Sequence, residues 1–182
     1  GDIRFSRYLA SRDWRPLRPK SKGELQALVV VAGPPDLERI NLPPVAVEKW
    51  VAYARAGLGE ELPTRQLPEG DRRATLENLV STLREAEEDI EILCLVCHGY
   101  LGTTGPILIL ENEDGTLEKV PGQELVKGIS KLPNRPRLVV LISCQSGGKS
   151  GRNAMSALGP ELARIGIPAI VAMQDNISME AA

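Results

Sequence analysis

The chain has 182 residues, enough for one domain that buries its own core without disulfides or a structural metal. Its formal net charge of -2, with 42% hydrophobic and 25% charged residues, is typical of a globular protein and argues against nucleic acid as a direct partner. The three cysteines lie at scattered positions, no apolar run approaches the roughly 18 residues of a membrane span, and there is no apolar signal segment. These features predict a cytoplasmic protein that does not bind membranes.

A basic, proline-bearing arm over residues 1–24 is expected to lie on the surface, ahead of a single domain over residues 25–182. The domain begins with a continuous, β-branched apolar run over residues 25–33, which predicts a strand buried on both faces, as in a parallel sheet. A helix is predicted next over residues 44–58, because the apolar side chains recur at helical spacing and the run stops at Gly59.

Strands and helices alternate along the rest of the domain. In chain order, the further predicted elements are an edge strand over 62–68, a helix over 74–90 with Thr75 as its N-cap, a strand over 90–97, a β-hairpin over 105–120 with Asp114 and Gly115 in its turn, a helix over 122–132, a strand over 137–143, a helix over 153–166 and a strand over 167–173. This order predicts an α/β fold with a mostly parallel sheet, helices on both faces and a β-hairpin insertion. Because no helix follows the last strand, we expect a sheet edge or an apolar face near Ala182 to be left uncovered.

A histidine and a cysteine stand at the ends of two of these strands. His98, the only histidine, follows the run over 90–97 and precedes Gly99, whereas Cys144 follows the run over 137–143 and begins the segment CQSGGKSG. Because sites in open α/β sheets form at the carboxyl ends of parallel strands, we expect the two side chains to lie close together. They are 46 residues apart (144 − 98), near the roughly 50 that separate histidine and nucleophile in caspase-type peptidases.

This pair of residues suits nucleophilic catalysis. A thiol with an ordinary pKa of roughly 8.5 is mostly protonated at neutral pH, so a nucleophilic Cys144 needs a base that can later protonate the leaving amine. Histidine titrates in that range, and His98 is the only imidazole in the chain. The backbone N–H groups of Gly99 and Cys144 are predicted to form an oxyanion hole, in which each donor contributes roughly 3 kcal/mol.

Structural interpretations compete with this one. A lone histidine at a strand end is more often a hydrogen-bonding structural residue, and a lone cysteine is more often a small buried residue, as we expect for Cys94 and Cys97. These two cysteines are three positions apart and are therefore predicted to point to opposite faces of their strand. Residues 144–151 are also rich in glycine like a phosphate-binding loop, but they lack the G-x-x-x-x-G-K-[ST] spacing. The combination of His98 and Cys144, each near glycine, favours catalysis.

Several segments resemble the CHAT domain, a caspase-like cysteine peptidase module that occurs with tetratricopeptide repeats and is related to separase. The segments are "LCLVCHGY", "LVVLISCQSG" and above all "LARIGIPAIVAMQDNIS", with further similarity in "SRYL", "ALVVVAGPPDLERI", "ATLENLVSTL" and "ILILENEDG". Together they span nearly the whole chain.

The resemblance implies a caspase-hemoglobinase fold and a cysteine endopeptidase that cleaves a protein substrate, with no cofactor and no metal. It implies that His98 is the general base and acid, that Cys144 is the nucleophile and that the amides of Gly99 and Cys144 are the oxyanion donors. In the family a further helix and a final strand usually follow the "AMQ" block, and neither follows it here. We therefore expect the C-terminal part of the fold to be missing and a fused repeat domain or a second chain to complete or regulate it.

Two other functions fit the same order of strands and helices. One is a catalytically idle CHAT-fold scaffold or interaction module, which the presence of both His98 and Cys144 disfavours. The other is a small-molecule-binding domain of flavodoxin type, which the lack of a phosphate loop disfavours.

Two aspartates follow predicted strands and are candidates for the substrate pocket. Asp36 comes after the first strand and Asp175 after the last, so both are expected to project toward the rim that carries Cys144. The simplest interpretation is that they cap or solvate loops. A desolvated carboxylate in the S1 pocket would instead favour arginine or lysine at the P1 position of the substrate.

Overall fold

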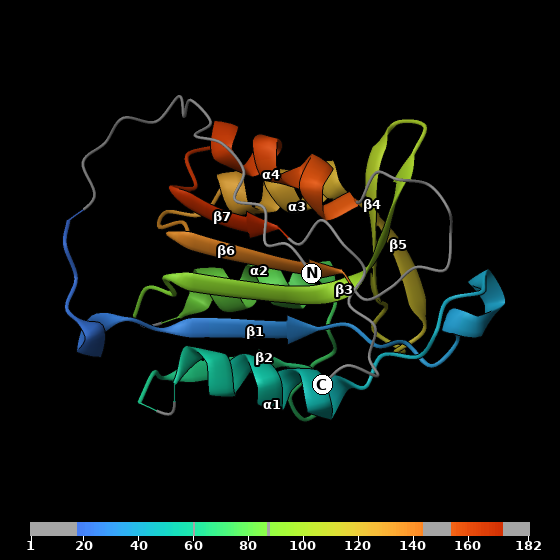
Figure 1. Cartoon of the computed structure of the whole chain (residues 1–182), viewed down its shortest axis with the longest axis horizontal. Coiled ribbons are helices and arrows are strands. Elements are labelled where there is room, and N and C mark those ends of the chain that lie inside the picture. Colours follow the sequence, from blue (N-terminus) through green and yellow to red (C-terminus); the bar gives the residue numbers. More distant parts are fainter. Residues whose placement is uncertain (1–17, 60, 87, 144–153, 173–182) are drawn as a thin grey trace, which may run out of the picture.

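Seven strands form one sheet within the residues that the computed structural model describes, which are 18–59, 61–86, 88–143 and 154–172 (Figure 1). The strands are β1 (Ala27–Val31), β2 (Thr64–Leu67), β3 (Ile92–Gly102), β4 (Gly105–Glu111), β5 (Leu117–Pro121), β6 (Leu138–Ser143) and β7 (Ala169–Ala172). The α-helices are α1 (Val47–Leu58), α2 (Leu76–Glu85), α3 (Gly122–Ser130) and α4 (Ala154–Arg164), and two short 3-10 helices are η1 (Lys22–Glu24) and η2 (Leu37–Ile40).

The sheet branches at β3. Strands β2, β1, β3, β6 and β7 lie side by side in that order and are all parallel. The carboxyl half of β3 continues into an antiparallel pairing with β4, which pairs antiparallel with β5. Figure 1 shows β4 and β5 standing across the end of the parallel strands. The predicted α/β fold with a mostly parallel sheet and a β-hairpin is confirmed and is consistent with a caspase-like fold.

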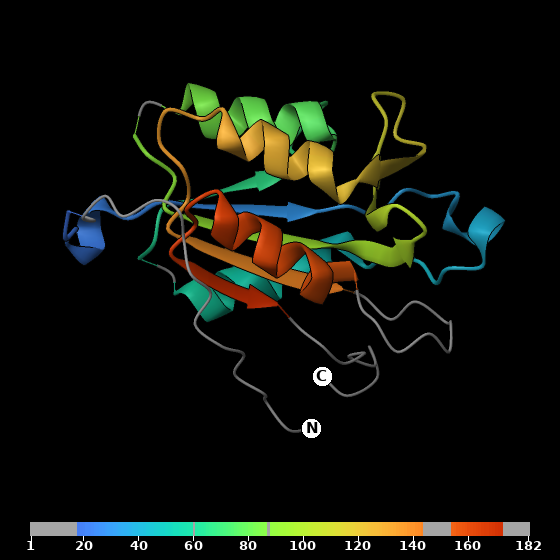
Figure 2. The same ribbon diagram turned by 90° about the horizontal axis from the view of Figure 1, so that it is seen from above.

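Helices cover both faces of the parallel strands, as predicted. One core layer joins the sheet to α2, α3 and α4, and the other joins it to α1 through Trp50. Figure 2 shows α2 and α3 on one side of the sheet and α1 on the other. Because alternate residues of a strand point to opposite faces, a strand covered on both sides must be apolar throughout. All five residues of β1 are buried, which explains its unbroken apolar run.

Local signals in the sequence correspond to observed caps and turns. The backbone N–H of Gly59 donates to the carbonyl of Arg55 and ends α1. The side chain of Thr75 accepts a hydrogen bond of 2.9 Å from the backbone N–H of Asn78 and begins α2. Gly115 has a φ of 83°, which the tight turn of the β4–β5 hairpin requires.

Several predicted boundaries are wrong: α2, expected over residues 74–90, spans only Leu76–Glu85, and two further differences have a tertiary cause. The strand expected to end at Cys97 continues to Gly102, because the polar, glycine-bearing segment after His98 pairs with β4 instead of forming a loop. Helix α1 begins at Val47 and not at residue 44, because Val45 packs into the core beside Gly33 before the helix starts. In both places a tertiary contact overrides the local pattern.

The outer strand β7 is the least covered part of the sheet. Among the described residues β7 pairs only with β6, and the side chain of Val171 is 50% exposed. Helix α1 packs against β1, which is three positions away from β7 in the order of parallel strands. Among the described residues β7 is therefore an outer strand, and Ala182, near which an uncovered edge is predicted, lies outside the described residues.

None of the described helices is both long and apolar enough to cross a membrane.

Gly33 lies so close to α1 that a side chain does not fit. A Cβ atom there would be 2.5 Å from Cγ2 of Val47 and 3.2 Å from the carbonyl oxygen of Val45. We expect Gly33→Ala to lower the free energy of unfolding by about 1–3 kcal/mol, because overpacking forces the neighbours apart. In Gly57→Ala, the matched control, nothing lies within 4 Å of the new Cβ, so stability should be unchanged or rise by up to about 1 kcal/mol. Urea unfolding measures both, and equal effects would contradict the packing argument.

Candidate active site

His98 lies where β3 changes partners. The preceding residue, Cys97, pairs with Ser143 of β6, whereas His98 itself pairs with Ile109 of β4. The His98 side chain is 1% exposed, and Ile109 opposite it belongs to the core layer on the α1 face. His98 therefore stands at the carboxyl end of the parallel segment of β3, as predicted, although the strand itself continues for four more residues.

One backbone carbonyl holds the imidazole. Nε2 of His98 lies 2.8 Å from the carbonyl oxygen of Pro43. A carbonyl oxygen only accepts hydrogen bonds, so Nε2 must carry the proton that is donated. In the neutral ring, Nδ1 then carries the lone pair and is the nitrogen that can accept a proton. The contact thus selects one tautomer of His98.

Pro43 belongs to the segment that joins β1 to α1. The sequence of this segment has prolines at positions 34, 35, 43 and 44, each of which fixes its own φ angle and narrows the backbone freedom of the residue before it. Leu37 of η2 is 2% exposed and anchors the middle of the segment in the core layer on the α1 face. A stiff and anchored backbone therefore presents the carbonyl to His98.

Asp36 lies in the same segment, and both of its carboxylate oxygens have partners in the chain. Oδ1 accepts a hydrogen bond of 2.8 Å from the backbone N–H of Leu117, and Oδ2 accepts one of 3.1 Å from Nη1 of Arg39. The Asp36 side chain is 18% exposed, whereas that of Arg39 is 75% exposed. These contacts join the β1–α1 segment to the start of β5, which is what a loop-fixing aspartate does.

Gly99 follows His98 and faces the opposite core layer. A Cβ atom at Gly99 would lie 3.0 Å from the carbonyl oxygen of Ile107 and 3.1 Å from Cβ of Ala154, the first residue of α4. The position therefore needs glycine for close packing, since even a methyl group would push α4 away from β3. This packing role is compatible with an additional role for the Gly99 amide.

Two predicted site residues, Cys144 and Asp175, lie outside the described residues. The other two cysteines are buried in the core. Cys94 belongs to the core layer on the α1 face and Cys97 to the opposite layer, so the prediction that they point to opposite faces is confirmed. Both side chains pack among apolar residues.

Glu111 is a buried residue of this region that the sequence analysis missed. Its side chain is 4% exposed, Oε1 accepts a hydrogen bond of 3.0 Å from the backbone N–H of Gly33, and Oε2 accepts one of 3.2 Å from that of Ala74. A glutamate at the end of an apolar strand gives no sign of this in the sequence, because charged residues commonly end strands. Only the tertiary structure brings the two N–H groups to it.

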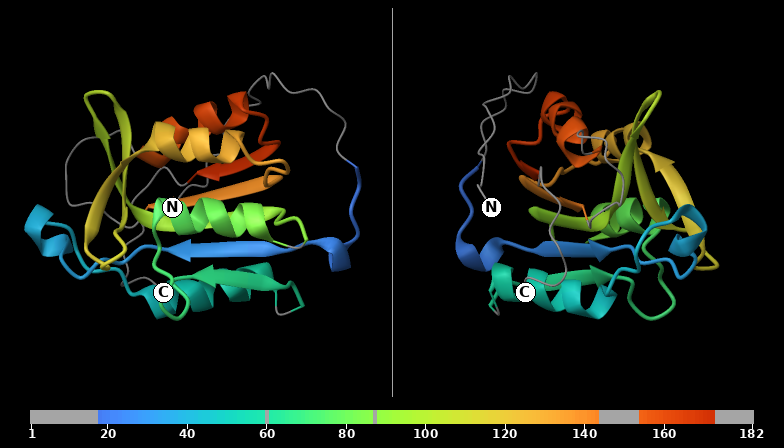
Figure 3. Two further views of the ribbon diagram at one scale, coloured as in Figure 1. Left: turned by 180° about the vertical axis from the view of Figure 1, so that it is seen from behind. Right: turned by 45° about the vertical axis from the view of Figure 1, so that its right-hand side comes forward.

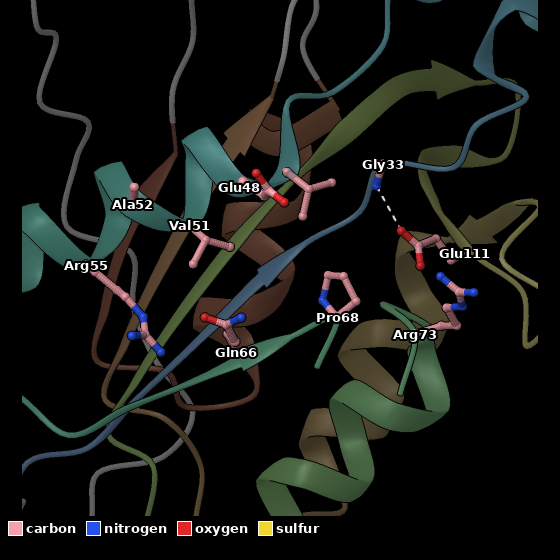
Figure 4. Close-up of a pocket in the computed structure, with 10 residues that line it drawn as sticks. Gly33, Glu48, Val51, Ala52, Arg55, Gln66, Pro68, Arg73 and Glu111 are labelled. Atoms are coloured by element: carbon pink, nitrogen blue, oxygen red, sulfur yellow. Dashed lines mark hydrogen bonds between the residues drawn. The ribbon is translucent and has the colours of Figure 1, made fainter. Parts of the chain in front are cut away.

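Glu111 also lines a pocket of about 560 Å³ between α1 and the region of β2 (Figure 4). Val51 and Arg55 of α1 line one wall, and Gln66 and Pro68 line the other. Neither His98 nor Pro43 is among the lining residues, so this pocket is separate from the imidazole.

The described residues contain no cluster of three or more histidine, cysteine, aspartate or glutamate side chains that could hold a metal ion.

The geometry thus joins a buried, orientated imidazole to the carboxyl end of a parallel sheet. The family model of the CHAT domain matches residues 4–182 of the chain. No curated protein matches the chain. Since the match covers nearly the whole sequence, the chain belongs to the CHAT-domain family, which is related to caspase-like peptidases.

Proposed function

We propose that the protein is a cysteine endopeptidase in which Cys144 is the nucleophile and His98 is the general base and acid. The observation that carries this proposal is the hydrogen bond between Nε2 of His98 and the carbonyl of Pro43. A catalytic imidazole must present a defined lone pair to its thiol, and this bond assigns that lone pair to Nδ1. A buried structural histidine also needs such an acceptor, so the proposal depends in addition on a thiol that can reach Nδ1.

The register of the sheet supports a position for Cys144 near His98. Ser143, which immediately precedes Cys144 in sequence, pairs with Cys97, which immediately precedes His98. Paired residues on neighbouring strands lie about 5 Å apart and consecutive Cα atoms about 3.8 Å apart, so a regular continuation of β6 would bring Cys144 within reach of the imidazole. Ala154, where the described chain resumes, has its Cβ 3.1 Å from the position that a Cβ atom on Gly99 would take.

The alternation of side chains supports the same face for both groups. Val140 and Ile142 of β6 pack in the core layer on the α1 face, where Ile109 opposite His98 also packs. Cys144 is the next residue in this series of alternate positions. A regular continuation of β6 would therefore direct the thiol and the imidazole to the same side of the sheet.

In the proposed reaction the Cys144 thiol transfers its proton to Nδ1 of His98 as the sulfur attacks the carbonyl carbon of the scissile peptide bond. The carbonyl π electrons move to oxygen and form an oxyanion. Collapse of this intermediate breaks the C–N bond, and the proton on Nδ1 passes to the leaving amine. Water then attacks the thioester with Nδ1 as base, and the thiolate leaves and recovers the proton. Throughout the cycle the carbonyl of Pro43 holds the protonated Nε2.

The pairing of β3 with β4 supports the Gly99 amide as an oxyanion donor. The two strands are joined by a two-residue turn between the paired residues Gly102 and Gly105, and Pro106, which has no N–H, lies opposite Leu101. Hydrogen-bonded and non-hydrogen-bonded pairs alternate along an antiparallel ladder. Because Leu101, opposite Pro106, cannot be in a pair that exchanges hydrogen bonds, the pairs that do so are those of the even-numbered residues of β3. The N–H of Gly99 then points away from β4. An oxyanion donor at this position would contribute roughly 3 kcal/mol to the transition state.

The contacts of Asp36 reduce the candidates for a residue that determines the P1 preference to one. Asp36 uses both oxygens within the chain, so a preference for arginine or lysine at P1 would rest on Asp175. We further propose a protein substrate and regulation by a fused repeat domain or a partner chain, as in the family that the chain resembles.

The dyad predicts the behaviour of three variants. With the regulatory module or partner present, His98→Ala and Cys144→Ala should each lower kcat for a peptide substrate by at least about 10³-fold, and the double variant should be little worse, because the two residues act as one unit. Covalent labelling by an electrophilic peptide probe should be lost in Cys144→Ala. Strictly multiplicative losses, or no labelling of the activated wild type, would refute the dyad.

The buried thiol of Cys94 is expected to resist alkylation in the folded protein except at high pH. Burial raises the pKa of the Cys94 thiol to about 11. At pH 7.5, far below that value, its thiolate fraction is on the order of one in a thousand or less. Iodoacetamide should therefore modify Cys144 first in the folded protein, and Cys94 should react only as the pH approaches 11 or after unfolding in urea. Peptide mapping by mass spectrometry measures this order, and early modification of Cys94 at pH 7.5 would contradict it.

A further inference from the structure

The segment between Gly33 and Val45 is a closed excursion from the core. Its two ends meet, because a Cβ atom on Gly33 would lie 3.2 Å from the carbonyl oxygen of Val45 and 3.4 Å from its Cβ. Pro43 lies two residues before that closure, and Asn41, with a φ of 56°, redirects the chain toward it. The position of the Pro43 carbonyl therefore depends on what fixes this excursion.

Two carboxylates tie the excursion to the β4–β5 hairpin. Asp36 Oδ1 accepts from the backbone N–H of Leu117, and Glu111 Oε1 accepts from the backbone N–H of Gly33, where the excursion leaves β1 (Figure 4). Figure 3 shows η2, the helix that begins just after Asp36, close to β5. Leu117 and Glu111 are themselves paired across the hairpin, so both ties meet the hairpin at one pair of residues.

The same hairpin also positions the imidazole. Strand β4 pairs with the carboxyl half of β3, and Ile109, two residues before Glu111, lies opposite His98. The β4–β5 hairpin consequently fixes both partners of the hydrogen bond between His98 and Pro43. It fixes the ring through the pairing of β4 with β3, and it fixes the carbonyl through the two carboxylates. A shift of the excursion relative to the hairpin would therefore change that bond.

We propose that Asp36 and Glu111 are positioning residues of the active site: they clamp the β1–α1 segment to the β4–β5 hairpin so that the Pro43 carbonyl keeps His98 in the Nε2-protonated tautomer. The inference rests on the proposed function for its catalytic meaning, but its structural content does not depend on it. Both carboxylates accept from backbone N–H groups within the chain, so the role assigned to them is positioning and not catalysis.

The single histidine of the chain gives a direct test. In the full chain labelled with ¹⁵N-histidine, long-range ¹H–¹⁵N correlations distinguish the protonated ring nitrogen from the one with the lone pair. The wild type should show a protonated Nε2 with a slowly exchanging proton. Asp36→Ala should give a mixture of the two tautomers and fast exchange of that proton. In the assay, its kcat should fall by about 10²-fold with KM little changed, as expected when a reacting group is displaced by about 1 Å.

Conservative variants separate positioning from general damage. Asp36→Asn keeps an oxygen that accepts from Leu117 and loses only the pairing with the exposed Arg39, so it should restore the wild-type tautomer. Glu111→Gln should not, because its amide nitrogen faces one of two backbone N–H donors. Asp114→Ala is the matched control: it removes an aspartate that accepts from the backbone N–H of Thr116 in the same hairpin but does not touch the β1–α1 segment.

The outcomes are distinct. A wild-type tautomer in folded Asp36→Ala and Glu111→Gln, or an equal change in Asp114→Ala, would overturn the clamp. If Asp36→Ala does not fold, the contrast between Asp36→Asn and Glu111→Gln decides the question. Failure of the proposed peptidase activity would show as the absence of Cys144 labelling in the wild type, and it would leave the tautomer measurement valid.

Discussion

The hydrogen bond from Nε2 of His98 to the carbonyl of Pro43 is the interaction on which the proposed site depends. The chain has one histidine, so no second imidazole can take over its role. A ring that is 1% exposed cannot turn to water for a partner, and a buried N–H without an acceptor costs about 1–3 kcal/mol. The fold must therefore supply an acceptor, and its position decides which ring nitrogen is left to act as a base.

The branched strand β3 explains how the fold meets this requirement. Its amino half is held between β1 and β6, so its position is determined by the main core. Its carboxyl half pairs with β4 alone in the antiparallel part of the sheet, and this change of partner occurs between Cys97 and His98. At that point His98 lies against the main core and one position beyond the pairing of Cys97 with Ser143, the last described residue of β6. The branch thus creates the site, and the hairpin that causes the branch also holds the loop that supplies the acceptor.

The sequence predicts the elements and the place of the histidine well, because these depend on local patterns. The all-apolar run of β1, the stop at Gly59, the cap at Thr75 and the Asp114–Gly115 turn are all recognisable without tertiary information. The sequence does not predict the contacts of Glu111 or the acceptor at Pro43, because residues that are 78 and 55 positions apart meet only in the folded chain. Nor does it show that Asp36 turns toward Leu117, since a strand-end aspartate has the same local pattern whether it binds a loop or a substrate.

The carbonyl of Pro43, as the acceptor beside Nε2 of His98, suits a thiol nucleophile. A carboxylate next to an imidazole strongly stabilises the imidazolium, which helps when a serine hydroxyl must be deprotonated. A cysteine thiol gives up its proton far more easily, so it needs less of that stabilisation. The carboxylates of this region, Asp36 and Glu111, accept instead from backbone N–H groups and act on the position of the carbonyl. A neutral acceptor at Nε2 thus orientates the imidazole while the two carboxylates determine the position of that acceptor, an arrangement that fits the proposed Cys144 nucleophile.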